Sequence, residues 1–216
     1  MKKMREHLEA FLIQDDLSLF ESLDSPVKIQ NFLDNTRYSP EDRNRCPLNV
    51  IRDRQAHCLD GGLFAAAALS RLGYPPLIID LYPEIGIDDD HVLAIFKENG
   101  FWGAVAKSNY VGLRYREPVY RNLRELVMSY FDLFYNINGI RTLRSYSRPI
   151  NVSRFDRYEW EFNDQGADKI ESHLKTLSAI PVISPIQIVN LTPLDELSYR
   201  AGMLAANPEG LYKPKR

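Results

Sequence analysis

The sequence places a cysteine and a histidine where they can cooperate as nucleophile and base. Cys58 stands at the start of an apolar run that is typical of a buried helix, and His91 opens a predicted strand. A thiol reacts only as its thiolate, and the unpaired N–H groups and dipole of a helix N-terminus favour that anion. A nearby histidine can take the thiol proton and hold it as imidazolium. The backbone N–H of Cys58, at the same helix end, can donate to a developing oxyanion.

A third residue is expected to orient the imidazole of His91, and two positions qualify. Two apolar runs flank Asn99-Gly100, which predicts a hairpin with a two-residue loop. In that register His91 lies opposite Ser108 on the same face of the sheet. A single bulge at the strand end would bring Asn109 into line instead, and its side-chain oxygen can accept from an imidazole N–H. Chemistry therefore favours Asn109 and register favours Ser108; we take Asn109 as the third catalytic residue.

The elements that must position these residues follow from hydrophobic spacing. Residues 58–72 are apolar on nearly all sides, which indicates a helix in the middle of a domain, and Gly73 with Pro75-Pro76 ends it. Further helices are expected near 8–23, from Ser25-Pro26 through Leu33, and over 123–134, and further strands at 77–81, 143–146 and 186–189.

The ordered pattern around Cys58 resembles the transglutaminase-like superfamily, within the papain-like cysteine enzyme fold, in a bacterial-type form. In that family a cysteine, often with an acid two residues later, begins a helix rich in small residues. A Leu-Gly-x-Pro turn, a strand and a strand-opening histidine follow. The matching residues are Cys58, Asp60, Ala65-Ala66, Leu69, Leu72-Gly73-Tyr74-Pro75, His91 and Trp102.

The resemblance covers roughly a quarter to a third of the chain and implies both a fold and a chemistry. The fold is α+β, with a central buried helix that bears Cys58 packed on an antiparallel sheet that bears His91 and Asn109. The chemistry is acyl transfer through a cysteine thioester, as amide hydrolysis, peptide cleavage or transamidation. It needs no cofactor, and its substrate would be a peptide, a protein or a small amide.

Two departures from the family pattern keep a second hypothesis open. The family aspartate should fall between Ala106 and Asn109, and no aspartate is present there. His57 precedes Cys58 where relatives often have a small residue or Gln, and we give His57 a structural or substrate-edge role. The alternative is therefore a catalytically inactive form of the fold that binds a peptide or protein, with Cys58 inert.

Other chemistry-bearing residues receive less specific interpretations. Asp88-Asp89-Asp90 lacks the alternating spacing of a calcium loop, so we interpret it as a solvated acidic turn or one that raises the pKa of His91. Asp60 in the first helical turn complements the helix dipole. Cys46, His57, Cys58 and His91 have no standard zinc spacing, so no metal is expected.

Length and composition favour one globular domain. The chain has 216 residues, 26% of them charged, with a net charge of -2, which excludes a disordered chain and gives no reason to expect a nucleic-acid platform. Nine arginines with interleaved tyrosines lie in residues 113–157; we expect the tyrosines to pack and the arginines to pair with the acidic loop. We predict one domain over 1–206, with a helical N-terminal segment, a core at about 50–112 and a flexible tail at 207–216.

Cysteine content and hydropathy bear on the compartment. Two cysteines cannot form a disulfide framework, and their low number suits a reducing compartment. The apolar run Ala10–Ile13 is too short for a signal peptide or a membrane span. We predict a cytoplasmic protein without a membrane partner, and the sequence leaves its oligomeric state open.

Overall fold

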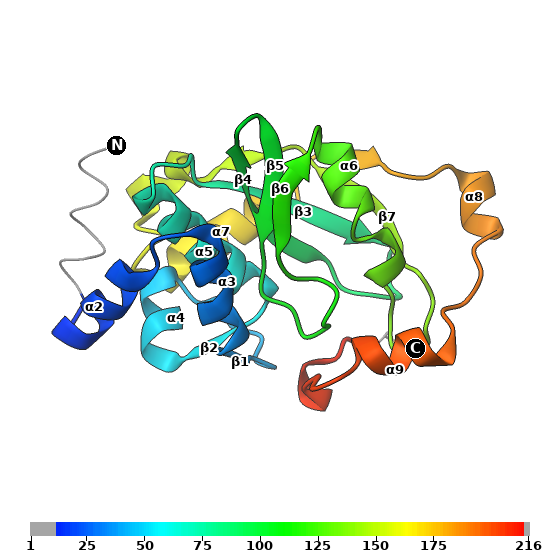
Figure 1. The fold of residues 1–216 in the computed structure, drawn as a ribbon, viewed down its shortest axis with the longest axis horizontal. Coiled ribbons are helices and arrows are strands. Elements are labelled where there is room, and N and C mark those ends of the chain that lie inside the picture. The colour runs from blue at the N-terminus through cyan, green and yellow to red at the C-terminus, as the bar shows by residue number, and fades with distance from the viewer. Residues whose placement is uncertain (1–11, 214–216) are drawn as a thin grey trace.

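A long buried helix lies on one face of an antiparallel sheet in the computed structural model, which describes residues 12–213 (Figure 1). The helix, α5 (Cys58–Arg71), is buried from Leu59 through Leu69. The sheet has the strand order β6-β5-β4-β3-β7-β9, and β8 pairs with β3. The predicted α+β class, with a central buried helix on an antiparallel sheet, is confirmed.

The remaining elements surround this core. The helices are α2 (Gln14–Ser22), α3 (Pro26–Asp34), α4 (Pro47–Asp53), α6 (Leu123–Met128), α7 (Asp164–Leu174), α8 (Pro185–Val189), α9 (Glu196–Gly202) and the 3-10 turns η1 (Phe131–Leu133), η2 (Val152–Tyr158) and η3 (Pro208–Gly210). The strands are β1 (Arg37–Tyr38), β2 (Gln55–Ala56), β3 (Leu77–Pro83), β4 (His91–Glu98), β5 (Phe101–Val105), β6 (Arg116–Tyr120), β7 (Leu143–Ser147), β8 (Ile150–Asn151) and β9 (Ala179–Pro181). Strands β1 and β2 form a separate parallel pair.

Strand β4 is buried on both faces and separates two hydrophobic cores. Val92 and Ala94 pack with α5 and the helices around it. Leu93 and Ile95 pack on the other face with α6. Because alternate side chains enter different cores, a slip of one residue would exchange them, and the register of β4 is strongly specified. The position of His91 at the first residue of β4 is fixed by the same constraint.

The hairpin of β4 and β5 has the predicted register as far as Val105. Glu98 pairs with Phe101, and the pairing continues to Ala94 with Val105. Asn99 and Gly100 have φ values of 50° and 90°, as a two-residue type I′ loop requires. Strand β5 ends at Val105, so the ladder stops before it reaches Ser108.

Two local predictions need correction, and a third is only partly described. The helix expected over 123–134 ends at Met128 and is followed by η1. The strand expected at 186–189 is the helix α8, because Gln187 Oε1 accepts a hydrogen bond of 2.8 Å from the Ser184 backbone N–H and Pro185 occupies the first turn. The helix expected near 8–23 is α2 in its described part, and residues 8–11 lie outside the described residues.

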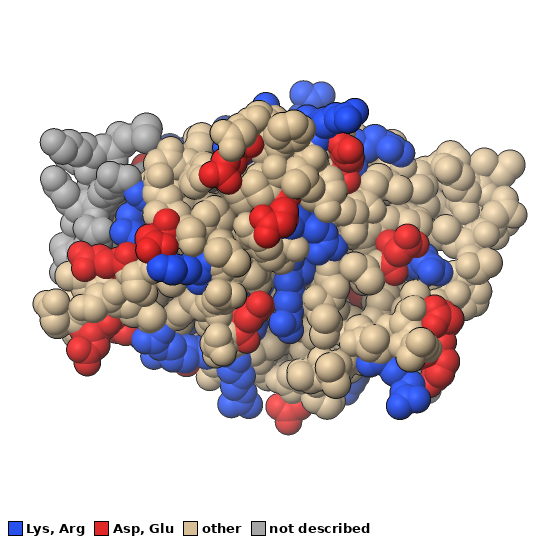
Figure 2. All heavy atoms as spheres, in the orientation of Figure 1, with Lys and Arg blue, Asp and Glu red and all other residues tan. Residues whose placement is uncertain are grey.

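The arginines of residues 113–157 were expected to pair with Asp88, Asp89 and Asp90, but within residues 12–213 their ion pairs are with other acids. Arg114 lies 3.4 Å from Asp34, and Arg144 lies 2.7 Å from Glu84. The Arg116 guanidinium stacks over the Tyr130 ring, 3.9 Å from its centroid. Charges of both signs are interspersed on the face shown in Figure 2. Across residues 12–213, no helix combines the length and the apolar character that a membrane crossing demands.

Close packing of α5 on the chain after β5 predicts that Gly61→Ala is destabilising. A Cβ at Gly61 would lie 2.2 Å from Lys107 Cβ. Alanine normally stabilises a helix relative to glycine by about 1 kcal/mol, but overpacking costs about 1–3 kcal/mol. Because 2.2 Å is a severe overlap, we take the upper end of that cost and expect a net loss of about 2 kcal/mol in the free energy of unfolding, measured by urea denaturation. Ser70→Ala on the same helix is the matched control, and equal stability of Gly61→Ala and wild type would contradict the packing.

Candidate functional site

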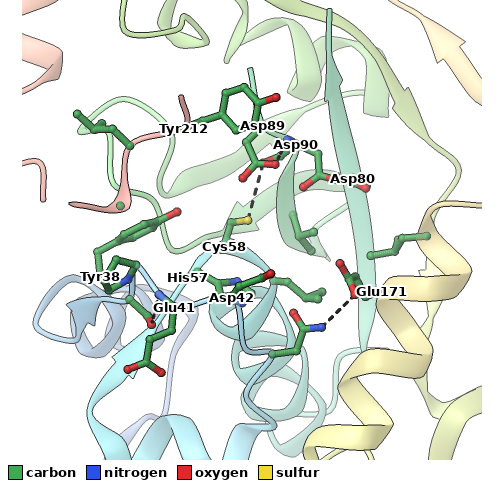
Figure 3. A pocket seen from close by; sticks show the side chains of 18 of the residues that line it. Tyr38, Glu41, Asp42, His57, Cys58, Asp80, Asp89, Asp90, Glu171 and Tyr212 are labelled. Atoms are coloured by element: carbon green, nitrogen blue, oxygen red, sulfur yellow. Dashed lines mark hydrogen bonds between the residues drawn. The ribbon is translucent and has the colours of Figure 1, made fainter. Parts of the chain in front are cut away.

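A cavity of about 350 Å³ lies at the N-terminal end of α5, with Cys58 in its wall. The sulfur points toward Asp90, with Tyr38 on one side and Asp80 on the other (Figure 3). An adjoining pocket of about 40 Å³ is lined by Cys58, His91, Ser108 and Asn109. The small pocket therefore brings together Cys58, His91 and both candidates for the third catalytic residue.

The start of α5 is fixed by the carboxylate of Asp60. This side chain is fully buried and accepts hydrogen bonds from the backbone N–H of His57 at 3.1 Å and of Arg45 at 2.6 Å. Arg45 is itself buried and forms an ion pair of 3.0 Å with Asp53. Asp60 therefore does more than complement the dipole, because it joins the loop before α4 to the first turn of α5.

His57 makes its polar contacts with the neighbouring loop and also lines the larger cavity, so the structural and the substrate-edge roles both stay predictions. Its Nε2 lies 3.2 Å from the carbonyl oxygen of Arg43 and 3.2 Å from Asp60 Oδ1. Burial lowers its pKa to about 4, so the ring is neutral at pH 7 and holds the loop beside the cavity.

The imidazole of His91 is oriented by a backbone carbonyl. Its Nε2 lies 2.8 Å from the Leu113 oxygen, and its ring packs edge-on against Phe134 with centroids 6.4 Å apart. A carbonyl only accepts, so Nε2 carries the hydrogen and Nδ1 has a free lone pair. Burial lowers the pKa of His91 to about 4 despite this hydrogen bond, and Arg116 lowers it further. The acidic turn does not raise the pKa of His91, contrary to one of the two sequence interpretations.

The orienting role assigned to Asn109 is wrong. Asn109 Nδ2 donates to the Asn207 oxygen at 2.9 Å, and its Oδ1 accepts from the Asn207 N–H at 2.7 Å. Ser108 Oγ accepts from the backbone N–H of Tyr110 at 3.0 Å. Because β5 ends at Val105, these residues leave the sheet and turn toward other partners. Every residue has a backbone carbonyl, so the sequence could not indicate that Leu113 is the partner of His91.

The surroundings of Cys58 favour its neutral thiol. Its Sγ lies 3.8 Å from the carbonyl oxygen of Asp90, next to His91, and within residues 12–213 no hydrogen bond joins Cys58 to His91. Burial raises the pKa of the Cys58 thiol, and the carboxylates of Asp90 and Asp89 raise it further. The Cys58 side chain is half-buried, so its thiolate loses part of its hydration, and the two carboxylates act in the same direction. The N-terminus of α5 opposes them, because a helix end stabilises an anion by up to about 2 kcal/mol.

The larger cavity has an acidic lining that the sequence analysis did not identify. Asp80 lies in β3 on the α5 side of the sheet and is 2% exposed, and its Oδ1 has no partner among the described residues. Burial raises the pKa of Asp80, and it raises that of Asp90 to about 7. The one available signal was an aspartate inside the apolar run 77–81. Other acids on the lining are Glu41, Asp42, Asp89, Glu171 and Glu209, with Lys175 as the basic residue. No three His, Cys, Asp or Glu side chains in the described part of the chain are arranged to hold a metal ion.

Comparisons with known proteins give only a distant structural likeness. Two structures of Legionella pneumophila LapG, one of them EGTA-treated, resemble the chain. The EGTA-treated structure has a TM-score of 0.36 and 16% identity over 50% of this chain and 69% of LapG. The other has a TM-score of 0.35 and 15% identity over 55% of this chain and 88% of LapG. Similarity at this level assigns neither a family nor an activity. No protein-family model matches the chain, and no curated protein matches it.

Burial of His91 predicts a pH-dependent contribution to stability. Its pKa is about 4 in the folded chain against 6.5 for an ordinary histidine, so between these values the unfolded chain binds a proton that the folded chain refuses. This contribution is complete above pH 6.5 and is lost as the pH falls toward 4. We expect wild type to lose about 2 kcal/mol relative to His91→Gln between pH 7 and pH 5, measured by urea denaturation at both values.

The paired comparison is needed because Asp60 and Asp90, with pKa values of about 7, contribute in the opposite direction. The glutamine amide can still donate to the Leu113 carbonyl, so only the titration is removed. Nuclear magnetic resonance gives a second readout, in which the His91 ring stays neutral down to about pH 4. An imidazole that titrates near its ordinary value would contradict the buried geometry.

Proposed function

We propose that the protein is a cysteine-dependent acyl-transfer enzyme that hydrolyses or transamidates amides or peptides. One observation carries the proposal: Cys58 at the start of α5 shares a pocket with His91, whose Nε2–H is held by the Leu113 carbonyl. The free lone pair of His91 is thereby left on Nδ1, as a general base requires.

The reaction follows from the protonation states of these groups. Cys58 Sγ attacks the acyl carbon while its proton moves to His91 Nδ1, because neither partner is charged beforehand. The Leu113 carbonyl stabilises the imidazolium, and the Cys58 backbone N–H donates to the oxyanion. The C–N bond then breaks, and the leaving amine takes the proton from Nδ1. Water or a second amine then attacks the thioester and gives a proton to His91 Nδ1. The C–S bond breaks and that proton passes to the Cys58 sulfur, which regenerates the thiol without a cofactor.

A second function is favoured by the same electrostatics. A thiol whose pKa is raised by burial and by Asp90 is a poor nucleophile, and a buried neutral His91 hydrogen-bonded to a carbonyl has a stable structural role. In that case the cavity would bind a peptide or protein without chemistry. The substrate class, the cytoplasmic location and the absence of a membrane partner stay predictions under both functions.

Peptide cleavage by defined variants tests the proposal. We expect the purified protein at pH 7.5 to release products from a positional peptide library, detected by mass spectrometry. Hydroxylamine should divert the acyl group to hydroxamates, because it competes with water for the thioester. Cys58→Ala should reduce product by at least about 1,000-fold, and His91→Gln by about 100-fold or more.

The second cysteine supplies the matched control. Cys46 is buried at the start of α4, and burial raises its pKa to about 12, so Cys46→Ala should leave turnover unchanged. Cleavage that survives in Cys58→Ala would contradict the proposal. Peptide binding without any product in wild type would favour the binding module.

A further inference from the structure

The C-terminal residues of the chain return to the candidate site. Helix α9 is held by two hydrogen bonds: the backbone N–H of Val111 donates to the Gly202 oxygen at 3.1 Å, and the Tyr199 hydroxyl donates to the Ile137 oxygen at 2.9 Å. These contacts carry the chain back to the side of the molecule where β1 lies (Figure 1). We call residues 207–212 the strap. The prediction of a flexible tail at 207–216 is wrong for the strap, because these residues make specific contacts.

The strap is anchored by its main chain to a buried amide. The side chain of Asn109 exchanges hydrogen bonds of 2.7 and 2.9 Å with the N–H and C=O of Asn207. Asn109 is 6% exposed, and both of its side-chain hydrogen bonds within the described residues are to the strap. Asn207 Nδ2 also donates to the Tyr38 oxygen at 3.2 Å. Because Asn109 pairs with backbone atoms, another peptide can make the same two hydrogen bonds in its place.

A narrow slot in the strap's path admits glycine. A Cβ added at Gly210 would lie 2.7 Å from Tyr38 Cδ1 and 3.4 Å from Asn109 Nδ2. The first of these distances is too short for any larger residue unless the Tyr38 ring moves. The slot is therefore a specificity element beside the backbone anchor.

The strap lines the space beside the sulfur. Gly210 and Tyr212 line both the larger cavity and the small pocket that contain Cys58. In Figure 3, Tyr38 lies to the left of the sulfur and Tyr212 lies above it. Glu209 adds a further carboxylate to a lining that already includes Asp42, Asp89 and Glu171, and repulsion between like charges favours release of the strap.

We infer that the strap occupies the substrate cleft as an intramolecular peptide, and that the substrate is a peptide with glycine at the position of Gly210. This inference rests on the proposed function, because the bound peptide is a substrate only if Cys58 carries out acyl transfer. Main-chain pairing with Asn109 gives affinity, and the Tyr38 slot gives selectivity. The closed strap holds Cys58 in its unreactive state, and a competing peptide must displace the strap before it reaches the sulfur.

Alkylation of Cys58 in the full chain tests the inference. Gly210→Val drives a side chain into the Tyr38 ring and should release the strap. We expect iodoacetamide to label Cys58 at pH 8 at least about 10-fold faster than in wild type, read by peptide mass. Lys213→Val is the control, because Lys213 is exposed just beyond the slot, and its labelling rate should equal that of wild type.

A peptide added in trans tests the occupant. Acetyl-Asn-Pro-Glu-Gly-Leu-Tyr-amide should slow the labelling of Cys58 in Gly210→Val back toward the wild-type rate. The same peptide with Val for Gly should give no protection at a tenfold higher concentration, and one with Gln for Glu should protect at a lower concentration. Equal labelling of wild type and Gly210→Val, or equal protection by the Gly and Val peptides, would overturn the inference.

A second variant, Asn207→Pro, shows whether faster labelling of Gly210→Val comes from release of the strap or from misfolding. The labelling rate also tests the strap separately from the proposed acyl transfer. Asn207→Pro removes the N–H that Asn109 accepts, at a φ of -76° that proline adopts readily. It should also accelerate labelling, without added bulk in the slot. The labelling rate of Cys58 and its protection by an added peptide do not depend on acyl transfer. Both effects can therefore be observed even if the protein cleaves no peptide. Cleavage that depends on Cys58 and His91, combined with no peptide protection, would refute the strap alone.

Discussion

The candidate site depends on one buried carboxylate. Asp60 accepts the backbone N–H groups of His57 and Arg45 and has no exposed surface. These bonds fix where α5 begins and hold the loop that forms one wall of the cavity. A buried carboxylate without such donors would be strongly unfavourable, so the loop and the helix end stabilise each other. The placement of Cys58 against the start of β4 follows from this arrangement.

The same compactness that positions Cys58 suppresses its reactivity. The helix end favours a thiolate, but burial and the carboxylates of Asp89 and Asp90 oppose it more strongly. His91 is likewise uncharged, because burial removes the water that would stabilise an imidazolium. The structure therefore corresponds to a closed state of neutral partners. Displacement of the strap would admit water to Cys58 and reduce the largest of these effects.

Most of the fold could be predicted from the sequence, because its signals are local. The apolar run 58–72 and the Asn99-Gly100 loop each determine their element through nearby residues. The prediction at 186–189 is wrong because the apolar spacing there also fits a strand, whereas Ser184 and Gln187 form a capping box that starts a helix. The sequence pattern also predicted that Cys58 and His91 lie close together, and both line one pocket.

The details of the site were beyond sequence reasoning because they depend on long-range and main-chain contacts. The partner of His91 is the carbonyl of Leu113, and every residue has a carbonyl. Asn109 is paired with Asn207, which is 98 positions away along the chain. Asp80 was hidden in an apolar strand, and only the packing of α5 on that face reveals it as part of the cavity.

The ionisation of Cys58 in the native protein shows directly whether Cys58 and His91 are neutral partners. Thiolate absorbance near 240 nm should be recorded from pH 5 to pH 10, with Cys58→Ala subtracted as the blank. We predict no thiolate from Cys58 below about pH 9, because burial and Asp90 raise the pKa of its thiol above the ordinary value of 9.0. A thiolate that is already present at pH 6 would show an ion pair with His91 and would contradict the closed, neutral site.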